Sequence, residues 1–298
     1  MVMFWMKILF SHILYNDIQY QFWLLKKKLI YFLSSIFPNL FVSIAYKHLT
    51  SPQVHTLRPH EALMLNKAEQ TEFPFEDFII RTYRWGTGSK TVLLVHGWEG
   101  QAGNFADLIE VLIADDYTVY AFDGPGHGAS SKGKTSLFKF SKLVGALICK
   151  YAIKKIVSHS FGGVATTVFL GNSPEIVIDR YVLFTTPNRF ENRIQFVAEM
   201  VGVCDRVIKL LIKKIEQEEG IIVSEMNVAA YAVKSQVKKA LILHDTNDRV
   251  LSVEQSKEVN AHWEEATLEE VTGTGHYRIL RTESVLKRAL SFLNGTSN

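Results

Sequence analysis

The chain has 298 residues, of which 47% are hydrophobic and 21% charged, so it can bury a substantial core. This composition excludes a wholly disordered chain, and 18 glycines with 7 prolines exclude a collagen-like one. A net charge of +3 gives no electrostatic basis for nucleic-acid binding, which needs a concentrated basic face.

The N-terminal part differs in composition from the rest. Residues 1–25 are crowded with aromatic and aliphatic side chains, and Lys26, Lys27 and Lys28 precede the uncharged stretch 29–46. That stretch is 18 residues long, at the lower limit for a membrane-spanning helix, but Pro38 would break or kink it. The cationic cluster comes too late for a cleavable signal peptide, and no small-x-small cleavage site follows.

Three interpretations of this segment stay open. It is a helix or helix pair that packs on the domain or lies at a membrane interface, a true membrane anchor, or an upstream extension without a structural role, with Met6 as the start.

The two cysteines, Cys149 and Cys204, exclude a disulfide framework and a cysteine-based zinc site. They favour a reducing compartment, so we expect a cytoplasmic protein, with peripheral membrane contact through residues 1–50 as an open alternative.

From about residue 76, short β-rich runs alternate with longer helical segments. The predicted strands are Phe78–Tyr83, Thr91–Val95, Tyr117–Phe122, Ile153–Val157, Arg180–Phe184, Ala240–Leu243 and Thr267–Val271. The predicted helices cover about 103–114, 136–150, 161–171, 253–262 and 279–293. This alternation predicts an α/β fold with a mainly parallel sheet that helices cover on both faces.

The same pattern divides the chain. We expect residues 1–66 to form an apolar helical extension and residues 76–298 to form the α/β domain. Within that domain, residues 187–237 are too long for a simple crossover, and apolar side chains recur in them at three- and four-residue spacing. We expect a helical insertion there, either a lid over the strand ends or a segment packed plainly on the core.

The strongest local signal is the run Ser158-His159-Ser160-Phe161-Gly162, which leads from a buried strand through a tight turn into a helix. This context is typical of a G-x-S-x-G nucleophile elbow, in which Ser160 is the central serine. Ser158 stands where the pattern has its first glycine. It is a tolerated small residue, a sign of a decayed site, or a further hydroxyl near the site.

An activated serine needs a base within hydrogen-bond reach and a carboxylate that orients this base. Asp245 and Asp248 follow the predicted strand at 240–243, and His276 follows the one at 267–271, in the order serine, acid, histidine. We therefore predict Ser160 as the nucleophile and His276 as the general base. The plain alternative for His276 is a histidine in a surface loop.

From about residue 76 to its end, the chain resembles the α/β-hydrolase fold superfamily, in particular its bacterial serine hydrolases and esterases. His96-Gly97-Trp98 resembles the oxyanion loop of that superfamily. The run 123–130 resembles its D-x-x-G-x-G-x-S segment, and 244–250 is similar to its acid loop, which begins H-G-x-x-D, with Asp245 in place of glycine.

The resemblance implies a catalytic acid at Asp248, with Asp245 as the fallback, and an oxyanion hole formed by the backbone N–H groups of Trp98 and Phe161. It implies a structural role for Asp123. Neither a metal nor another cofactor is needed, and we interpret His96, His127 and His159 as structural or supporting residues. Some bacterial members also carry a helical segment before a sequence like 57–61, which favours a packed or peripheral N-terminus over a spanning one.

The implied function is a serine hydrolase, carboxylesterase- or lipase-like, that cleaves a carboxylic ester or related acyl bond of a small molecule with an apolar group. Thioesterase, peptidase and cofactor-free haloperoxidase activities use the same triad and stay open. A different class also stays open, namely a non-catalytic binding or membrane-associated protein of this fold, which the departures at Ser158 and Asp245 would explain.

Overall fold

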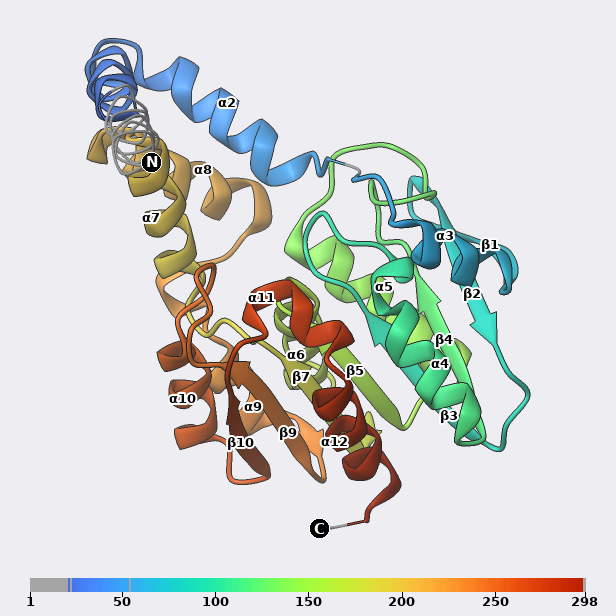
Figure 1. Cartoon of the computed structure of the whole chain (residues 1–298). Helices are drawn as coiled ribbons and strands as arrows, with labels where there is room; N and C mark the ends of the chain where they lie inside the picture. Colours follow the sequence, from blue (N-terminus) through green and yellow to red (C-terminus); the bar gives the residue numbers. More distant parts are fainter. Residues whose placement is uncertain (1–20, 22, 54, 297–298) are drawn as a thin grey trace, which may run out of the picture. The chain divides into compact units, whose positions relative to one another are not determined.

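A computed structural model of the chain describes residues 21, 23–53 and 55–296 (Figure 1). The chain divides into two compact units. One contains the described residues up to His48 together with Phe190–Val223, and the other contains Leu49–Arg189 and Ser224–Asn298. The features noted for residues 1–20, Met6 among them, lie outside the described residues.

The larger unit is built on one sheet of eight strands in the order β1-β2-β4-β3-β5-β7-β9-β10. The pairs β1–β2 and β2–β4 are antiparallel, and every other neighbouring pair is parallel, so the mainly parallel sheet predicted from the sequence is confirmed. The strands are β1 (Glu69–Phe75), β2 (Phe78–Trp85), β3 (Lys90–Val95), β4 (Tyr117–Phe122), β5 (Lys155–His159), β7 (Arg180–Phe184), β9 (Ala240–Asp245) and β10 (Ala266–Val271). A separate short pair joins β6 (Val177–Ile178) to β8 (Gln236–Val237).

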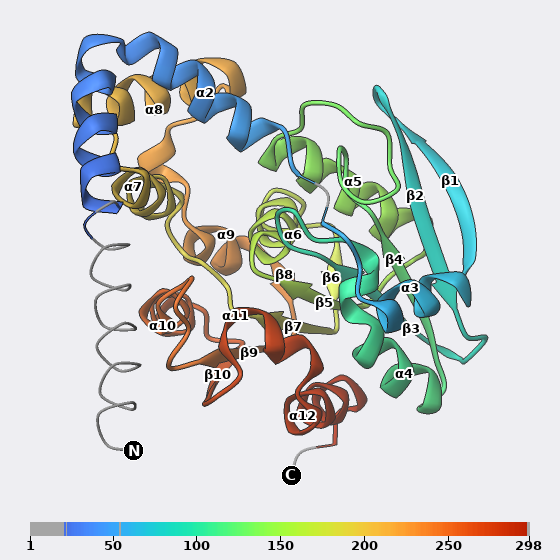
Figure 2. The same cartoon turned by 45° about the horizontal axis from the view of Figure 1, so that its top comes forward.

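Helices cover both faces of this sheet (Figure 2). One face carries α3 (Pro59–Asn66), η1 (Ala102–Phe105), α4 (Ala106–Ala114), η3 (Ile279–Arg281) and α12 (Glu283–Asn294). The other carries α5 (Leu137–Lys150), α6 (Phe161–Gly171), α9 (Val228–Lys234) and α10 (Val253–His262). The short helix α11 (Gly275–Arg278) follows β10.

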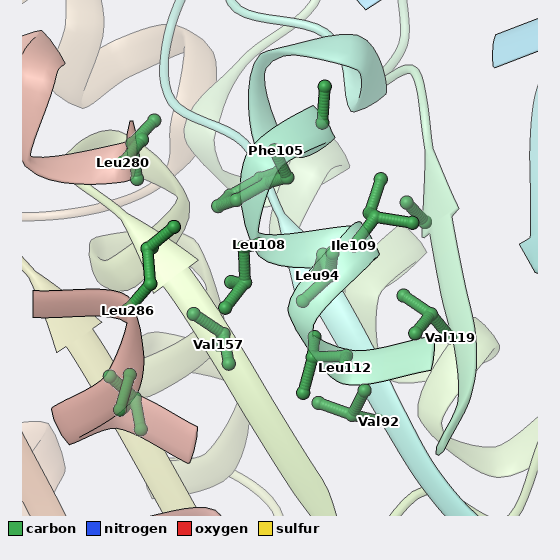
Figure 3. Close-up of a cluster of buried hydrophobic side chains, with 14 of the residues drawn as sticks. Val92, Leu94, Phe105, Leu108, Ile109, Leu112, Val119, Val157, Leu280 and Leu286 are labelled. Atoms are coloured by element: carbon green, nitrogen blue, oxygen red, sulfur yellow. The ribbon is translucent and has the colours of Figure 1, made fainter. Parts of the chain in front are cut away.

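A continuous apolar core joins the sheet to its first helical layer (Figure 3). Val92 and Leu94 of β3 and Val157 of β5 are fully buried there, and Leu108 and Leu286 meet them from α4 and α12. The central strands read as continuous apolar runs because both of their faces are buried. This rigid layer fixes the positions of the strand ends.

The smaller unit is helical. It consists of the helix Trp23–Ile36, α2 (Pro38–Thr50), α7 (Phe190–Val201) and α8 (Asp205–Glu219). Its core is a small cluster in which Val42 packs with Cys204 and Val207, and the Cys204 amide donates a hydrogen bond of 2.9 Å to Ser34 Oγ. After α7 and α8 the chain returns to the larger unit at Ser224, and there α9 contacts α6.

The break expected at Pro38 is present, since one helix ends at Ile36, the next begins at Pro38, and the two meet at a bend of 115°. Within the described residues, no single helix is both long and apolar enough to cross a bilayer. The two helices on either side of the bend meet that criterion only when they are taken together.

The structure also contains elements that the hydrophobic pattern did not predict. Strand β1 pairs along the edge of β2 with mostly exposed side chains, so it lacks the apolar alternation that marks a half-buried strand. The predicted strand at Ile153 begins two residues later, at Lys155, because Ala152 turns the chain with φ of 48°. The segment 187–237 contains the helices α7, α8 and α9, and its role as a lid insertion stays a prediction.

A close approach of α6 to the end of β3 predicts a large cost for one added methyl group. A Cβ at Gly162 would lie 2.4 Å from the His96 carbonyl oxygen and 2.5 Å from that of Val95, and backbone atoms cannot move aside. We expect Gly162→Ala to lower the free energy of unfolding by about 3 kcal/mol in urea denaturation. The matched control is Gly163→Ala, because a Cβ there would meet only side-chain atoms, at 3.3 Å or more. This change should alter the free energy of unfolding by less than about 1 kcal/mol. Equal effects of the two changes would contradict this packing.

Candidate active site

The predicted site residues all follow parallel strands at one edge of the sheet. The oxyanion-loop residues 96–98 come directly after β3, Ser160 directly after β5, Asp248 three residues after β9, and His276 five residues after β10. Because carboxyl ends of parallel strands share one edge, residues separated by more than 100 positions in sequence meet there.

Ser160 has a backbone conformation that is rare for a residue with a side chain, with φ of 50° and ψ of −119°. Its amide donates to the Phe184 carbonyl at 2.9 Å, which extends the β5–β7 pairing, while its own carbonyl accepts from the Gly163 amide in the first turn of α6 at 2.8 Å. The strained residue is thus held by a strand on one side and a helix on the other. This is the geometry of a nucleophile elbow.

The structure joins the side chains of Ser160, His276 and Asp248 in one hydrogen-bonded row. His276 Nε2 lies 3.2 Å from Ser160 Oγ, and His276 Nδ1 lies 2.7 Å from Asp248 Oδ2. The His276 and Asp248 side chains are 5% and 0% exposed. An ionised carboxylate can only accept hydrogen bonds. Nδ1 of His276 therefore carries the ring proton, and Nε2 is free to accept the proton of the Ser160 hydroxyl.

Asp248 is held as a carboxylate. Its Oδ1 accepts from the Val250 and Leu251 amides at 2.7 and 3.0 Å, and its Oδ2 lies 3.5 Å from His244 Nε2. Burial alone would raise the pKa of Asp248, but hydrogen bonds from His244, His276 and Leu251 outweigh it and hold the pKa far below its ordinary range. The acid is therefore ionised at neutral pH.

Asp245, the fallback acid, binds backbone rather than the imidazole. Its Oδ2 accepts from the amides of Thr274 and Gly275, and its Oδ1 accepts from the Asn247 amide at 2.7 Å. The Thr274 hydroxyl also donates to Oδ2 at 2.9 Å. Of the two carboxylates in this loop, Asp248 faces the His276 ring, while Asp245 fixes the turn that delivers His276.

Ser158, which replaces the first glycine of the elbow pattern, lies beneath the turn. It is fully buried, and its hydroxyl is 2.9 Å from the Tyr181 hydroxyl, which itself donates to the Gly163 carbonyl at 3.2 Å. Burial, offset in part by a hydrogen bond with Ser158, raises the pKa of Tyr181 to about 12 and keeps the phenol neutral. The additional hydroxyl thus has a partner below the elbow and stabilises the turn.

The loop after β3 runs against the elbow. A Cβ on Gly97 would lie 3.2 Å from the His159 carbonyl oxygen and 3.5 Å from Ser160 Cβ. The rings of Trp98 and Phe161 meet edge to face with centroids 5.3 Å apart. The Phe161 amide belongs to the first turn of α6, where backbone N–H groups have no acceptor within the helix.

Three buried histidines and one aspartate connect the loops around this site. His96 Nε2 accepts from the Gly124 amide at 2.8 Å, and His159 Nε2 donates to the His276 carbonyl at 2.9 Å. Asp123 accepts from the Ala102 and Ala129 amides, each at 2.8 Å, which confirms the structural role expected for it. Burial lowers the pKa of His96 to about 4 and those of His127 and His159 to about 3. These rings are therefore neutral at physiological pH.

Sequence reasoning assigned no role to His244. It is fully buried at the end of β9, with Nδ1 2.6 Å from Ser256 Oγ and Nε2 3.0 Å from the Leu251 carbonyl, beside Asp248. A role for His244 could have been inferred from its position directly after an apolar run, because a buried histidine needs hydrogen-bond partners. In the part of the chain that the structure describes, no three His, Cys, Asp or Glu side chains are grouped so that they could hold a metal ion.

Comparison with known proteins gives both sequence and structural relatives. A family model described as serine aminopeptidase, S33, matches residues 87–231. The chain is 38% identical to a human serine hydrolase-like protein over 112 residues, which are 35% of this chain and 53% of that protein. It spans only 27% to 53% of the length of the first curated relatives that it matches.

Solved structures share the fold over most of the chain. An esterase of Pyrococcus furiosus, Pf2001, superposes with a TM-score of 0.62 at 20% identity and covers 84% of this chain and 98% of its own. A bacterial membrane phospholipase A superposes with a TM-score of 0.61 at 16% identity and covers 98% of this chain and 99% of its own. At these identities the similarity shows the fold.

The buried histidines predict a steep loss of stability in mild acid. His127 binds a proton near its ordinary pKa of about 6.5 when unfolded, but only near 3 when folded, so its stabilisation is complete above 6.5 and is lost as the pH falls toward 3. We expect His127→Gln to reduce the slope of unfolding free energy against pH by about 1.4 kcal/mol per unit between those values. Urea denaturation at a series of pH values measures this slope. His262→Gln, at an exposed position, is the control, and an unchanged slope in His127→Gln would show that the ring is protonated in the folded protein.

Proposed function

Because the chain belongs to the α/β-hydrolase superfamily of serine hydrolases, we propose that it hydrolyses a carboxylic ester, or a related acyl bond, through Ser160, His276 and Asp248. One observation carries this proposal. The hydrogen-bonded row from Ser160 Oγ through both ring nitrogens of His276 to Asp248 Oδ2 has the contacts that nucleophilic catalysis requires.

In the proposed reaction, His276 Nε2 takes the proton of Ser160 Oγ as the oxygen attacks the substrate carbonyl carbon. The tetrahedral intermediate then collapses, His276 gives the proton to the leaving alcohol, and an acyl-enzyme ester on Ser160 results. Water, deprotonated by His276, attacks this ester, and His276 then returns the proton to Ser160 Oγ as the acid leaves. Asp248 stays ionised throughout and stabilises the imidazolium ion, in keeping with the lowered pKa of its carboxyl.

The charge on the carbonyl oxygen would be met by the backbone N–H groups of Phe161 and Trp98. The Phe161 amide begins α6 directly after the nucleophile, and the Trp98 loop packs against the elbow through Gly97. One such donor is typically worth about 3 kcal/mol of transition-state stabilisation. The α6 dipole acts in the same direction, since its positive end lies at Phe161.

Other residues would position the reacting groups without touching the substrate. Asp245 holds the turn before His276, and His159 donates to the His276 carbonyl. His244 lies between Ser256 and the carboxylate of Asp248. Together these contacts would fix the backbone of His276 and the carboxylate of Asp248, and so align the imidazole with Ser160.

The departures that would explain a non-catalytic protein have structural accounts. Ser158 is bonded to Tyr181, and Asp245 binds the amides before His276, so both residues support the site. For the substrate, the aromatic rings of Trp98 and Phe161 beside the elbow favour an apolar acyl or alkyl group. The fold similarity to an esterase and to a membrane phospholipase A agrees with an ester.

The test is hydrolysis of p-nitrophenyl esters of increasing chain length by the purified chain, beside an acyl thioester and an aminoacyl p-nitroanilide. We expect ester hydrolysis, with kcat lowered about 10⁴-fold in Asp248→Asn because the imidazole loses its orienting acceptor. Asp245→Asn should lower kcat no more than about 30-fold and mainly lower the melting temperature, because it loosens only the turn before His276.

Asp179→Asn, at an ion pair with Lys238 on the surface, is the control for the charge change. Loss of activity in Asp245→Asn with retention in Asp248→Asn, both variants being folded by circular dichroism, would reverse the assignment of the acid. Cleavage of the anilide alone would replace the esterase by a peptidase, as the description of the matching family model suggests.

A further inference from the structure

The helices on either side of the Pro38 bend expose an unusual amount of apolar surface. Nine large apolar side chains within this short segment are 46% to 61% exposed: Trp23, Leu25, Leu29, Tyr31, Phe32, Ile36, Phe37, Leu40 and Ile44. Single exposed apolar residues are normal, but a contiguous set marks an interaction surface.

Six of these side chains follow helical spacing. Leu25, Leu29, Phe32 and Ile36 recur every three or four residues on the helix Trp23–Ile36, and beyond the bend Leu40 and Ile44 are four residues apart on α2. We call these six residues the outer face. A different set of side chains on the same helices makes the unit's own core, since Ser34 binds the Cys204 amide and Val42 packs on Val207. Helix α2 is therefore apolar on both its packed and its open sides, unlike an ordinary surface helix.

The charges carried by residues 23–50 themselves have a single sign, while the carboxylates nearest to Tyr46 of α2 come from α8, at Glu218 and Glu219. Residues 23–50 contain four lysines, Lys26, Lys27, Lys28 and Lys47, and no aspartate or glutamate. Lys27 is partly covered and lies 4.1 Å from the Trp23 ring centroid, whereas Lys26, Lys28 and Lys47 are exposed. An apolar stripe with cations and aromatic rings along it matches the boundary between the acyl chains and the headgroups of an anionic bilayer.

A second copy of the chain fits this surface less well. A two-fold dimer through the outer face would use the same patch on both subunits and would bring both lysine clusters into one interface. The segment supplies no carboxylate to neutralise them. Lipid phosphates would neutralise them directly.

We propose that the outer face lies on the surface of an anionic lipid bilayer, with its apolar side chains at the acyl boundary and Lys26, Lys28 and Lys47 at the phosphate level. The bend of 115° allows two short helices to lie in the interface one after the other, and neither is long enough to cross the bilayer alone. This proposal is independent of the catalytic one, because its evidence and its test involve no reaction.

The test is co-sedimentation of the full chain with phosphatidylcholine vesicles that contain or lack phosphatidylglycerol. The chain is purified in detergent, and the detergent is removed after the vesicles have been added. We expect stronger binding to the anionic vesicles. Replacing Leu29, Phe32 and Ile36 together by serine should lower partitioning at least about 100-fold, because three apolar side chains leave the acyl boundary. The matched control, Leu63→Ser with Val233→Ser, changes two equally exposed apolar residues of the larger unit and should leave binding unchanged.

A second pair of variants tests the charge independently of the apolar contacts. Lys26→Gln with Lys28→Gln should lower binding to anionic vesicles about 25-fold, with little change on neutral ones, since each lysine near such a surface contributes about fivefold. Lys142→Gln with Lys287→Gln is the control at comparably exposed positions.

Three results would overturn the proposal. The first is equal binding by the wild type and the triple-serine variant, with both folded by circular dichroism. The second is binding that alkaline carbonate does not release, which would mean a chain inserted across the bilayer. The third is absence of vesicle binding with self-association in sedimentation equilibrium that the triple variant abolishes, which would make the outer face a dimer interface.

Discussion

The candidate site depends on one strained residue. Ser160 keeps a positive φ because β5 and α6 are both anchored, and α6 can begin so close to β3 only because Gly162 has no side chain. The strain exposes Oγ at the strand end and simultaneously aligns the Phe161 amide with the start of a helix. Were the turn relaxed, the nucleophile and the proposed oxyanion donor would be displaced together.

The histidine and the acid reach the serine by the same principle of parallel strand ends. Asp248 and His276 come from loops that Asp245 joins, since the Asp245 carboxylate bridges the end of β9 to the turn after β10. His159, directly before Ser160, connects β5 to the same turn through the His276 carbonyl. The row of three side chains is thus supported by backbone contacts between the loops that carry it.

Much of this arrangement was predictable because its signals are local. A buried strand read as a continuous apolar run, and the residue types that followed each run indicated the chemistry at one sheet edge. The partners of Ser158 and Asp245 were not predictable, because Tyr181 and Thr274 lie far from them in sequence and carry no motif. Strand β1 was not predicted, because the side chains of this exposed edge strand show no alternation of apolar and polar residues. The pairing of the N-terminal helices with 190–223 was not predicted either, since both segments are rich in apolar side chains and no local signal says which apolar faces meet.

The segment around Pro38 is one whose composition allowed several structures. From the sequence, its apolar residues suited a packed helix pair, an interfacial one or a membrane anchor. The structure assigns one set of side chains to a helical core and leaves the outer face exposed. The larger unit, by contrast, buries its apolar residues in one continuous core against the sheet.

The central claim is that Ser160 is an activated nucleophile, and covalent labelling by a fluorophosphonate tests it most directly. We expect the purified chain to be labelled on the peptide that contains Ser160. Ser160→Ala should abolish the label, and His276→Ala should slow labelling at least about 10³-fold because the base is lost. Folded protein that takes up no label, or labelling that persists in Ser160→Ala, would contradict it.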